Sequence, residues 1–226
     1  MGSFLKWNNS PLTICFLAAQ AVLYYFILTA GGDLLVGTSY AAILLCFLFA
    51  LAHIRGGDRW IIGGLFFTAI ADFFLVVCSP IQQLWGMVAF LGTQSLYAVR
   101  LHRQNPKAWL LYLRISLTVA AGVVTAVVLK EKTDGLAVIS VCYYVNLITN
   151  ILMSFLRFRQ NKVFAIALVL FLLCDTVIGL QVACGAYLPI GENTLLYRIV
   201  FLPFNLSWLF YLPSQVLIAL CSQRKE

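Results

Sequence analysis

Charged side chains are scarce in this sequence: 10% of its 226 residues are Asp, Glu, Lys or Arg, whereas soluble domains average about 25%. Histidine occurs only 2 times, and the 7 cysteines stand singly, without the paired spacing of a disulfide framework or a zinc site. This scarcity of charge excludes a soluble enzyme. Two histidines also cannot supply the converging ligands of an intramembrane zinc hydrolase, so no metal or cofactor is expected.

Long apolar runs dominate instead. Hydrophobic residues make up 62% of the chain, and the mean hydropathy is +0.95, which leaves no room for a separate globular module. The runs are continuous and approach the roughly 20 residues that cross a bilayer as a helix; they lack the alternation of a barrel strand. We predict an all-α polytopic membrane protein, with residues 1–226 forming a single integral membrane domain. Eight transmembrane helices are expected at about 12–30, 34–53, 60–78, 82–101, 108–129, 135–156, 163–186 and 195–221.

The basic residues indicate an orientation, because short cytoplasmic loops collect Lys and Arg. With eight helices, Lys130, Lys132 and Arg198 fall on one side, and the remaining twelve of the 15 basic residues fall on the other. These twelve are Lys6, Arg55, Arg59, Arg100, Arg103, Lys107, Arg114, Arg157, Arg159, Lys162, Arg224 and Lys225. Both termini are therefore expected in the cytoplasm, and the net charge of +7 reflects topology rather than nucleic-acid binding. A cleaved signal peptide at the first run is the alternative, and it would leave seven helices with the N-terminus outside.

Two acidic residues are not explained by topology. Asp72 and Asp175 lie within apolar runs, where a charge costs about 2.5 to 3.5 kcal/mol at the bilayer centre. Each stands twelve residues after the start of its predicted helix, which places both roughly 18 Å deep. Two carboxyls at one level can face one cavity, where repulsion and desolvation would keep a proton available near neutral pH. The alternative is that each is a structural acid bonded within the bundle.

The surroundings of these two acids are alike. Residues 66–77 and 169–180 both consist of apolar residues around a single Asp. The two helices are four apart in the predicted order, which suggests a four-helix internal duplication.

Polar stripes run along three of the predicted helices, at spacings that put each stripe on one helix face. The stripes comprise Gly86, Phe90, Gln94 and Tyr97; Tyr143, Asn146, Asn150 and Ser154; and Asn205, Trp208, Tyr211 and Gln215. Pro203 and Pro213 in the last helix free backbone carbonyls for other partners. Hydrogen bonding between helices would explain any single stripe, but three stripes and two acids together indicate a lined pocket. The candidate substrate-binding residues are Gln94, Tyr97, Tyr143, Asn146, Asn150, Asn205, Tyr211 and Gln215.

Short motifs around these residues point to a family. They comprise residues 62–67, which are followed by Asp72 and Leu75; Gly86, Phe90 and Tyr97; residues 171–175; and a terminal Tyr211-x-x-x-Gln215 pattern. Over roughly residues 40–220, the chain resembles the YhhN-like family of eight-helix membrane proteins, whose characterised members are lysoplasmalogenases. Two positions depart from the family pattern. Ala71 stands where the family usually has Gly, and Gln94 stands where it usually has His, so a proton transfer that depends on that His would be lost.

The resemblance implies a lysoplasmalogenase-like hydrolase. Its substrate would be a single-chain ether lysophospholipid drawn from the membrane, cleaved at the vinyl ether bond to a fatty aldehyde and a glycerophospho-base. Asp72 and Asp175 would be the catalytic pair, since this reaction needs a general acid and a second carboxylate. The expected location is the cell membrane of a bacterium or the endoplasmic reticulum membrane of a eukaryote. A proton-coupled transporter, a lipid-binding protein without catalysis and a structural scaffold remain as alternatives.

Overall fold

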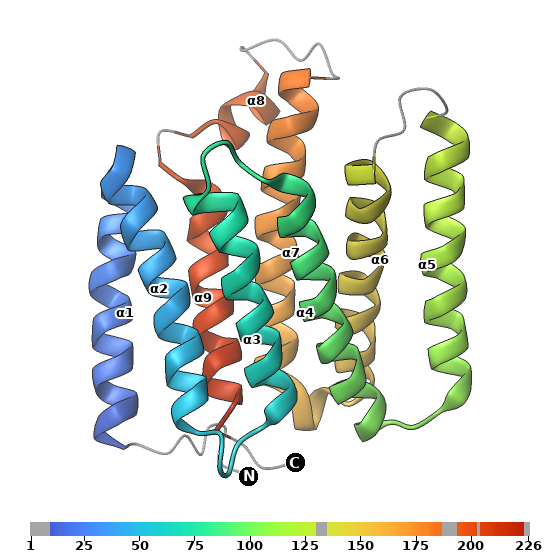
Figure 1. The fold of residues 1–226 in the computed structure, drawn as a ribbon, viewed down its shortest axis with the longest axis horizontal. Coiled ribbons are helices and arrows are strands. Elements are labelled where there is room, and N and C mark those ends of the chain that lie inside the picture. The colour runs from blue at the N-terminus through green and yellow to red at the C-terminus, as the bar shows by residue number, and fades with distance from the viewer. Residues whose placement is uncertain (1–9, 130–134, 187–193, 203, 224–226) are drawn as a thin grey trace.

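The computed structural model describes residues 10–129, 135–186, 194–202 and 204–223. All the regular elements within these ranges are helices, which confirms the predicted all-α class, and the long helices run side by side in one bundle (Figure 1). The elements are α1 (Pro11–Thr29), α2 (Gly32–Ala52), α3 (Arg59–Asp72), the π-helical turn η1 (Phe73–Val77), α4 (Gln83–Gln104), α5 (Ala108–Leu129), α6 (Gly135–Leu156), α7 (Phe158–Ala186), α8 (Leu195–Val200) and α9 (Leu206–Cys221).

Six of these helices are long and apolar enough to cross a membrane: α1, α2, α3 together with η1, α5, α6 and α7. The chain is therefore a multi-pass membrane protein. Helix α4 has 22 residues but is more polar, and α9 has 16 residues. Eight passes and the internal duplication stay predictions.

One predicted helix boundary was wrong. The range 195–221 is not one helix, because α8 ends at Val200 and α9 begins at Leu206. Phe201 has the non-helical angles φ −109° and ψ 42°, and its amide donates to the carbonyl of Tyr197, which closes the short helix. Pro203 lies outside the described residues.

The chain enters and leaves the bundle at the same end. Helix α1 begins and α9 ends there (Figure 1), and the side-chain amide of Gln223 donates to Oγ1 of Thr13 at 2.8 Å. The connections α2–α3, α4–α5 and α6–α7 lie at this end too. The basic residues in or beside these connections are Arg55, Arg59, Arg103, Lys107, Arg157, Arg159 and Lys162. This arrangement agrees with an even number of passes; that this end faces the cytoplasm stays a prediction.

A buried polar clamp joins α3, α4 and α7 at the same end. The Asp58 side chain caps the first amides of α3 and forms an ion pair with Arg100 of α4. Nη1 of Arg100 also donates to Oδ1 of Asn161 at 3.2 Å, at the position where α7 is kinked. Asp58 and Asn161 each stand 14 residues before an intramembrane acid, Asp72 and Asp175 respectively. The clamp therefore ties α3 and α7 together at residues that are equally far along the chain from the two acids.

Candidate active site

A cavity of about 250 Å³ opens among α3, η1, α4, α7 and α9, and both intramembrane acids line it. The rest of its lining consists of Leu75, Val76, Ile81, Gln83, Phe90, Cys174, Ile178, Ser207, Trp208 and Tyr211. Gln83 opens α4 and Ser207 lies in the first turn of α9, so the cavity lies toward the end of the bundle opposite the clamp. The structure thus brings Asp72 and Asp175 to one cavity, as the comparison of their depths predicted.

Asp72 occupies the junction between an α-helix and a π-helical turn. It is the last residue of α3, and in the next turn the amide of Cys78 donates to the carbonyl of Phe73 at 3.0 Å. Such turns are frequent at functional sites. The Asp72 side chain is buried, and its Oδ2 accepts a hydrogen bond from the hydroxyl of Tyr211 in α9 at 2.6 Å.

Asp175 of α7 has the same kind of partner. Its Oδ2 accepts a hydrogen bond from the hydroxyl of Tyr143 in α6 at 2.5 Å. Among the residues that the structure describes, none donates a hydrogen bond to Oδ1 of either acid. Each carboxyl group is therefore oriented through one oxygen, while the other oxygen is left for a substrate or a water molecule.

An aromatic cluster fixes the two tyrosines. The ring centroid of Phe90 lies 5.8 Å from that of Tyr143 and 6.5 Å from that of Tyr211. The Phe171 centroid lies 6.5 Å and 5.5 Å from the same two rings. All four pairs are T-shaped or tilted, which are favourable geometries for aromatic rings. The hydroxyl groups of both tyrosines are thereby held toward their carboxylates.

Gly86 allows α4 to approach the cavity wall. A Cβ atom at this position would lie 2.5 Å from Cγ of Leu75 in η1, closer than nonbonded carbon atoms can come. Leu75 lines the cavity. The glycine in the predicted stripe is therefore explained by the close packing of α4 on the π-helical turn.

The structure separates the eight predicted substrate-binding residues. Tyr211 lines the acid cavity and Tyr143 binds Asp175, but the other six do not line this cavity in the described residues. Tyr97 and Gln215 are buried elsewhere between the helices. Asn205 precedes α9, and its Oδ1 accepts a hydrogen bond from Ser207 at 2.8 Å.

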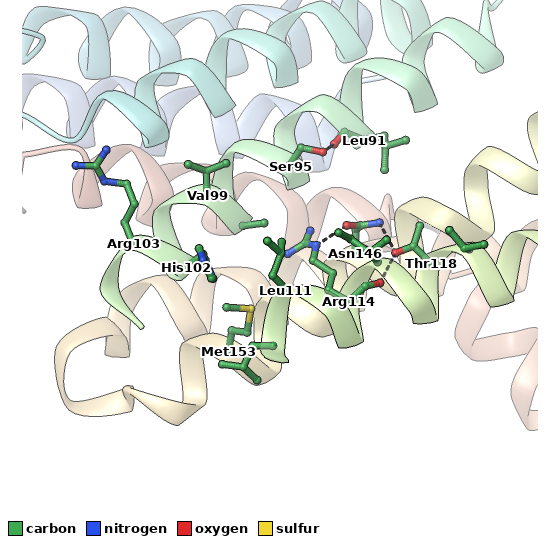
Figure 2. A pocket seen from close by; sticks show the side chains of 14 residues that line it. Leu91, Ser95, Val99, His102, Arg103, Leu111, Arg114, Thr118, Asn146 and Met153 are labelled. Atoms are coloured by element: carbon green, nitrogen blue, oxygen red, sulfur yellow. Dashed lines mark hydrogen bonds between the residues drawn. The ribbon is translucent and has the colours of Figure 1, made fainter. Parts of the chain in front are cut away.

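The remaining three, Gln94, Asn146 and Asn150, surround Arg114. Nε of Arg114 donates to Oδ1 of Asn146 at 2.7 Å, and Nη1 donates to Oδ1 of Asn150 at 2.7 Å. Nη2 donates to the backbone carbonyl of Gln94 at 3.3 Å. Two of the three predicted stripes thus meet a cation that was predicted to lie on the cytoplasmic side. Arg114 lies in the second turn of α5, toward the end of the bundle with the other basic residues, but its guanidinium is buried and bonded to amide groups (Figure 2).

Several features of the cavity carried no recognisable signal in the sequence. The π-helical turn has the same apolar composition as an ordinary helix, and Gln83, Cys174 and Ser207 belong to no predicted stripe. Cys174, next to Asp175, was the one hint of the cavity in the sequence. A cysteine that only packs between helices would look the same. For metal binding, no three side chains of His, Cys, Asp or Glu gather within the part of the chain that the structure describes.

Comparison with known proteins adds one finding. The sequence profile of the YhhN family matches residues 32–221, a range that contains the whole cavity. No curated protein and no solved structure matches the chain significantly.

Proposed function

Since this chain belongs to the YhhN family, we propose that it is a membrane hydrolase that cleaves the vinyl ether bond of lysoplasmalogens. The products are a fatty aldehyde and a glycerophospho-base. The observation that carries the proposal is the pair of carboxyl groups, Asp72 and Asp175, on one largely apolar cavity within a multi-pass membrane protein. A lipid with one hydrocarbon chain suits such walls, and paired acids suit its vinyl ether.

In the first step, the neutral member of the pair protonates the β-carbon of the vinyl ether. The electrons of the double bond form the new C–H bond, and the positive charge is shared between the α-carbon and the ether oxygen. The other acid, as a carboxylate, stabilises this oxocarbenium ion, as in glycoside hydrolysis. The aromatic lining residues Phe90 and Trp208 add favourable contact with a cation where their ring faces are presented.

In the second step, water adds to the α-carbon and gives one proton to one of the two carboxylates, which restores one neutral acid and one carboxylate. The resulting hemiacetal collapses to the aldehyde and the free alcohol of the glycerophospho-base. One water molecule is consumed, and the proton used in the first step is returned. Each acid accepts one hydrogen bond from a tyrosine. These contacts therefore do not assign the role of proton donor to either acid.

The cavity also suggests how the substrate lies. Leu75, Val76 and Ile178 offer apolar contact for the hydrocarbon chain, which enters sideways from the bilayer. Gln83 and Ser207 are uncharged polar residues of the lining, and they lie toward the end of the bundle opposite the clamp. We place the polar head beside them, toward water.

The test compares two lipids with the same chain and headgroup, one with a vinyl ether and one with a saturated ether. Purified protein in detergent micelles is expected to release aldehyde from the vinyl ether alone, because only its double bond can be protonated. Aldehyde is measured by mass spectrometry after trapping. If no vinyl-ether lysolipid yields aldehyde, and the protein in liposomes instead moves a solute together with protons, the proposal fails and the carrier alternative replaces it.

A further inference from the structure

A second, larger cavity lies on the other side of α4 from the acid cavity. Its volume is about 520 Å³, and it is a groove between α4, α5 and α6. Phe90 lines the acid cavity whereas the next residue, Leu91, lines this groove. Helix α5 lies at the edge of the bundle beside α6 (Figure 1), so the groove is next to the surrounding lipid.

The groove has an apolar wall and a basic end. Its apolar lining consists of Leu91, Ala98, Val99, Leu110, Leu111, Ile115, Val119 and Met153. Arg114, His102 and Arg103 also line it, and none of its described lining residues is acidic. His102 and Arg103 lie toward one end of the groove and Thr118 toward the other (Figure 2). That basic end is the end of the bundle where the chain enters and leaves, since His102 and Arg103 form the last turn of α4.

Arg114 is the residue of the groove that indicates a bound ligand. It is 7% exposed, and its three hydrogen-bond partners are the neutral oxygens of two asparagines and one backbone carbonyl. Within the described ranges, no carboxylate lies within ion-pair distance of it. Arg100 in the same bundle is instead paired with Asp58. A buried charge without a counter-ion is costly, so an anion supplied from outside would stabilise Arg114.

The polar contacts orient Arg114 without neutralising it. A guanidinium has five N–H donors, and the three hydrogen bonds to protein leave two donors free for a ligand. A phosphate oxygen is the natural acceptor, because arginine forms strong charge-assisted hydrogen bonds with phosphate. The volume lies within the range of small-molecule and lipid pockets, about 300 to 1,000 Å³.

We propose that this groove binds an anionic phospholipid of the bilayer, with its phosphate at Arg114 and one acyl chain along the apolar wall. The phosphate is the recognised chemistry, and the lipid is its source because the wall is apolar and adjoins the membrane. This site is separate from the acid cavity, so the lipid-binding proposal does not depend on the proposed hydrolysis.

Lipid binding to the full chain tests the proposal directly. The purified protein is titrated with phosphatidylglycerol and with diacylglycerol of the same chains, which lacks the phosphate, and binding is followed by native mass spectrometry. Phosphatidylglycerol is expected to bind at least tenfold more tightly. Arg114→Gln should remove this preference, since charge-assisted hydrogen bonds are worth about tenfold or more. Arg159→Gln, which removes an equal charge from an exposed position at the same end of the bundle, should keep it.

Two further arms keep the test decisive. Val99→Trp adds bulk to a partly exposed wall residue and should lower phosphatidylglycerol occupancy while leaving Arg114 in place, which matters if Arg114→Gln does not fold. Inorganic phosphate at millimolar concentration should not compete. Equal binding of the two lipids, an unchanged preference in Arg114→Gln, an unchanged occupancy in Val99→Trp, or full competition by inorganic phosphate would each overturn the proposal.

Discussion

The contact between Tyr211 and Asp72 offers a sharp test of how the cavity orients its acids. Tyr211→Phe removes the hydroxyl that donates to Oδ2 of Asp72 at 2.6 Å. The ring remains, and so do its contacts with Trp208 at 5.0 Å and with Phe171 at 5.5 Å. The substitution therefore deletes one hydrogen bond while the packing of the cluster is kept.

The size of the effect follows from the kind of bond removed. A hydrogen bond to a charged group contributes about 1.5 to 3 kcal/mol, which corresponds to roughly 10- to 150-fold in a rate or an affinity. The bond also exists in the resting protein, and turnover depends only on the additional strength that the bond has in the transition state. We therefore expect aldehyde release per folded molecule to fall about tenfold, the lower end of this range.

The assay is the initial rate of aldehyde release from a vinyl-ether lysolipid, normalised to the monodisperse protein recovered by gel filtration. Tyr24→Phe is the matched control, because it removes a tyrosine hydroxyl that donates to the backbone carbonyl of Leu209 at 2.9 Å and not to either acid. It should leave turnover unchanged. A Tyr211→Phe protein that folds and releases aldehyde at the wild-type rate would refute the claim that this hydroxyl orients Asp72.

Three further substitutions test other parts of the structure. Gly86→Ala should lower both the melting temperature and aldehyde release, since overpacking costs about 1 to 3 kcal/mol, whereas Gly179→Ala, with open space around its Cβ position, should change neither. Asp58→Asn should lower the unfolding free energy by about 3 to 5 kcal/mol, measured by denaturant titration, because it leaves Arg100 buried without its counter-ion; a loss below about 1 kcal/mol would contradict the clamp. Gln94→His should leave the rate of aldehyde release within about twofold of wild type, because position 94 does not line the acid cavity. A tenfold change in this rate would show that position 94 takes part in the reaction.

The sequence predicted the helical class and the meeting of the two acids for a clear physical reason. In a membrane, apolar runs that lack the alternation of a barrel strand must be helices, and helical rise converts residue spacing into depth. The depths of Asp72 and Asp175 could therefore be compared from residue numbers alone. Their tyrosine partners also lay on predicted stripes, so these contacts were within reach of the sequence.

The remaining errors come from what a stripe does not specify. A polar face on a helix indicates that it meets something polar, but not which partner it meets. Asn146 and Asn150 were therefore predicted to line the same cavity as the acids, although they bind Arg114 instead. Arg114 itself lies near a helix start, where a basic residue ordinarily reaches water. The break between α8 and α9 was missed because the apolar composition continues across it.

The central claim is that Asp72 and Asp175 carry out one reaction together, and their Asn variants test it most directly. Asp72→Asn, Asp175→Asn and the double variant are compared by aldehyde release, with Asp33→Asn at an exposed position in the first turn of α2 as the control. Each single variant should lose about 10² to 10⁴ in rate. The double variant should lose little more than the worse single variant, since groups that act as a unit are not additive. If either single variant keeps the rate of Asp33→Asn while folded, the paired-acid account is contradicted.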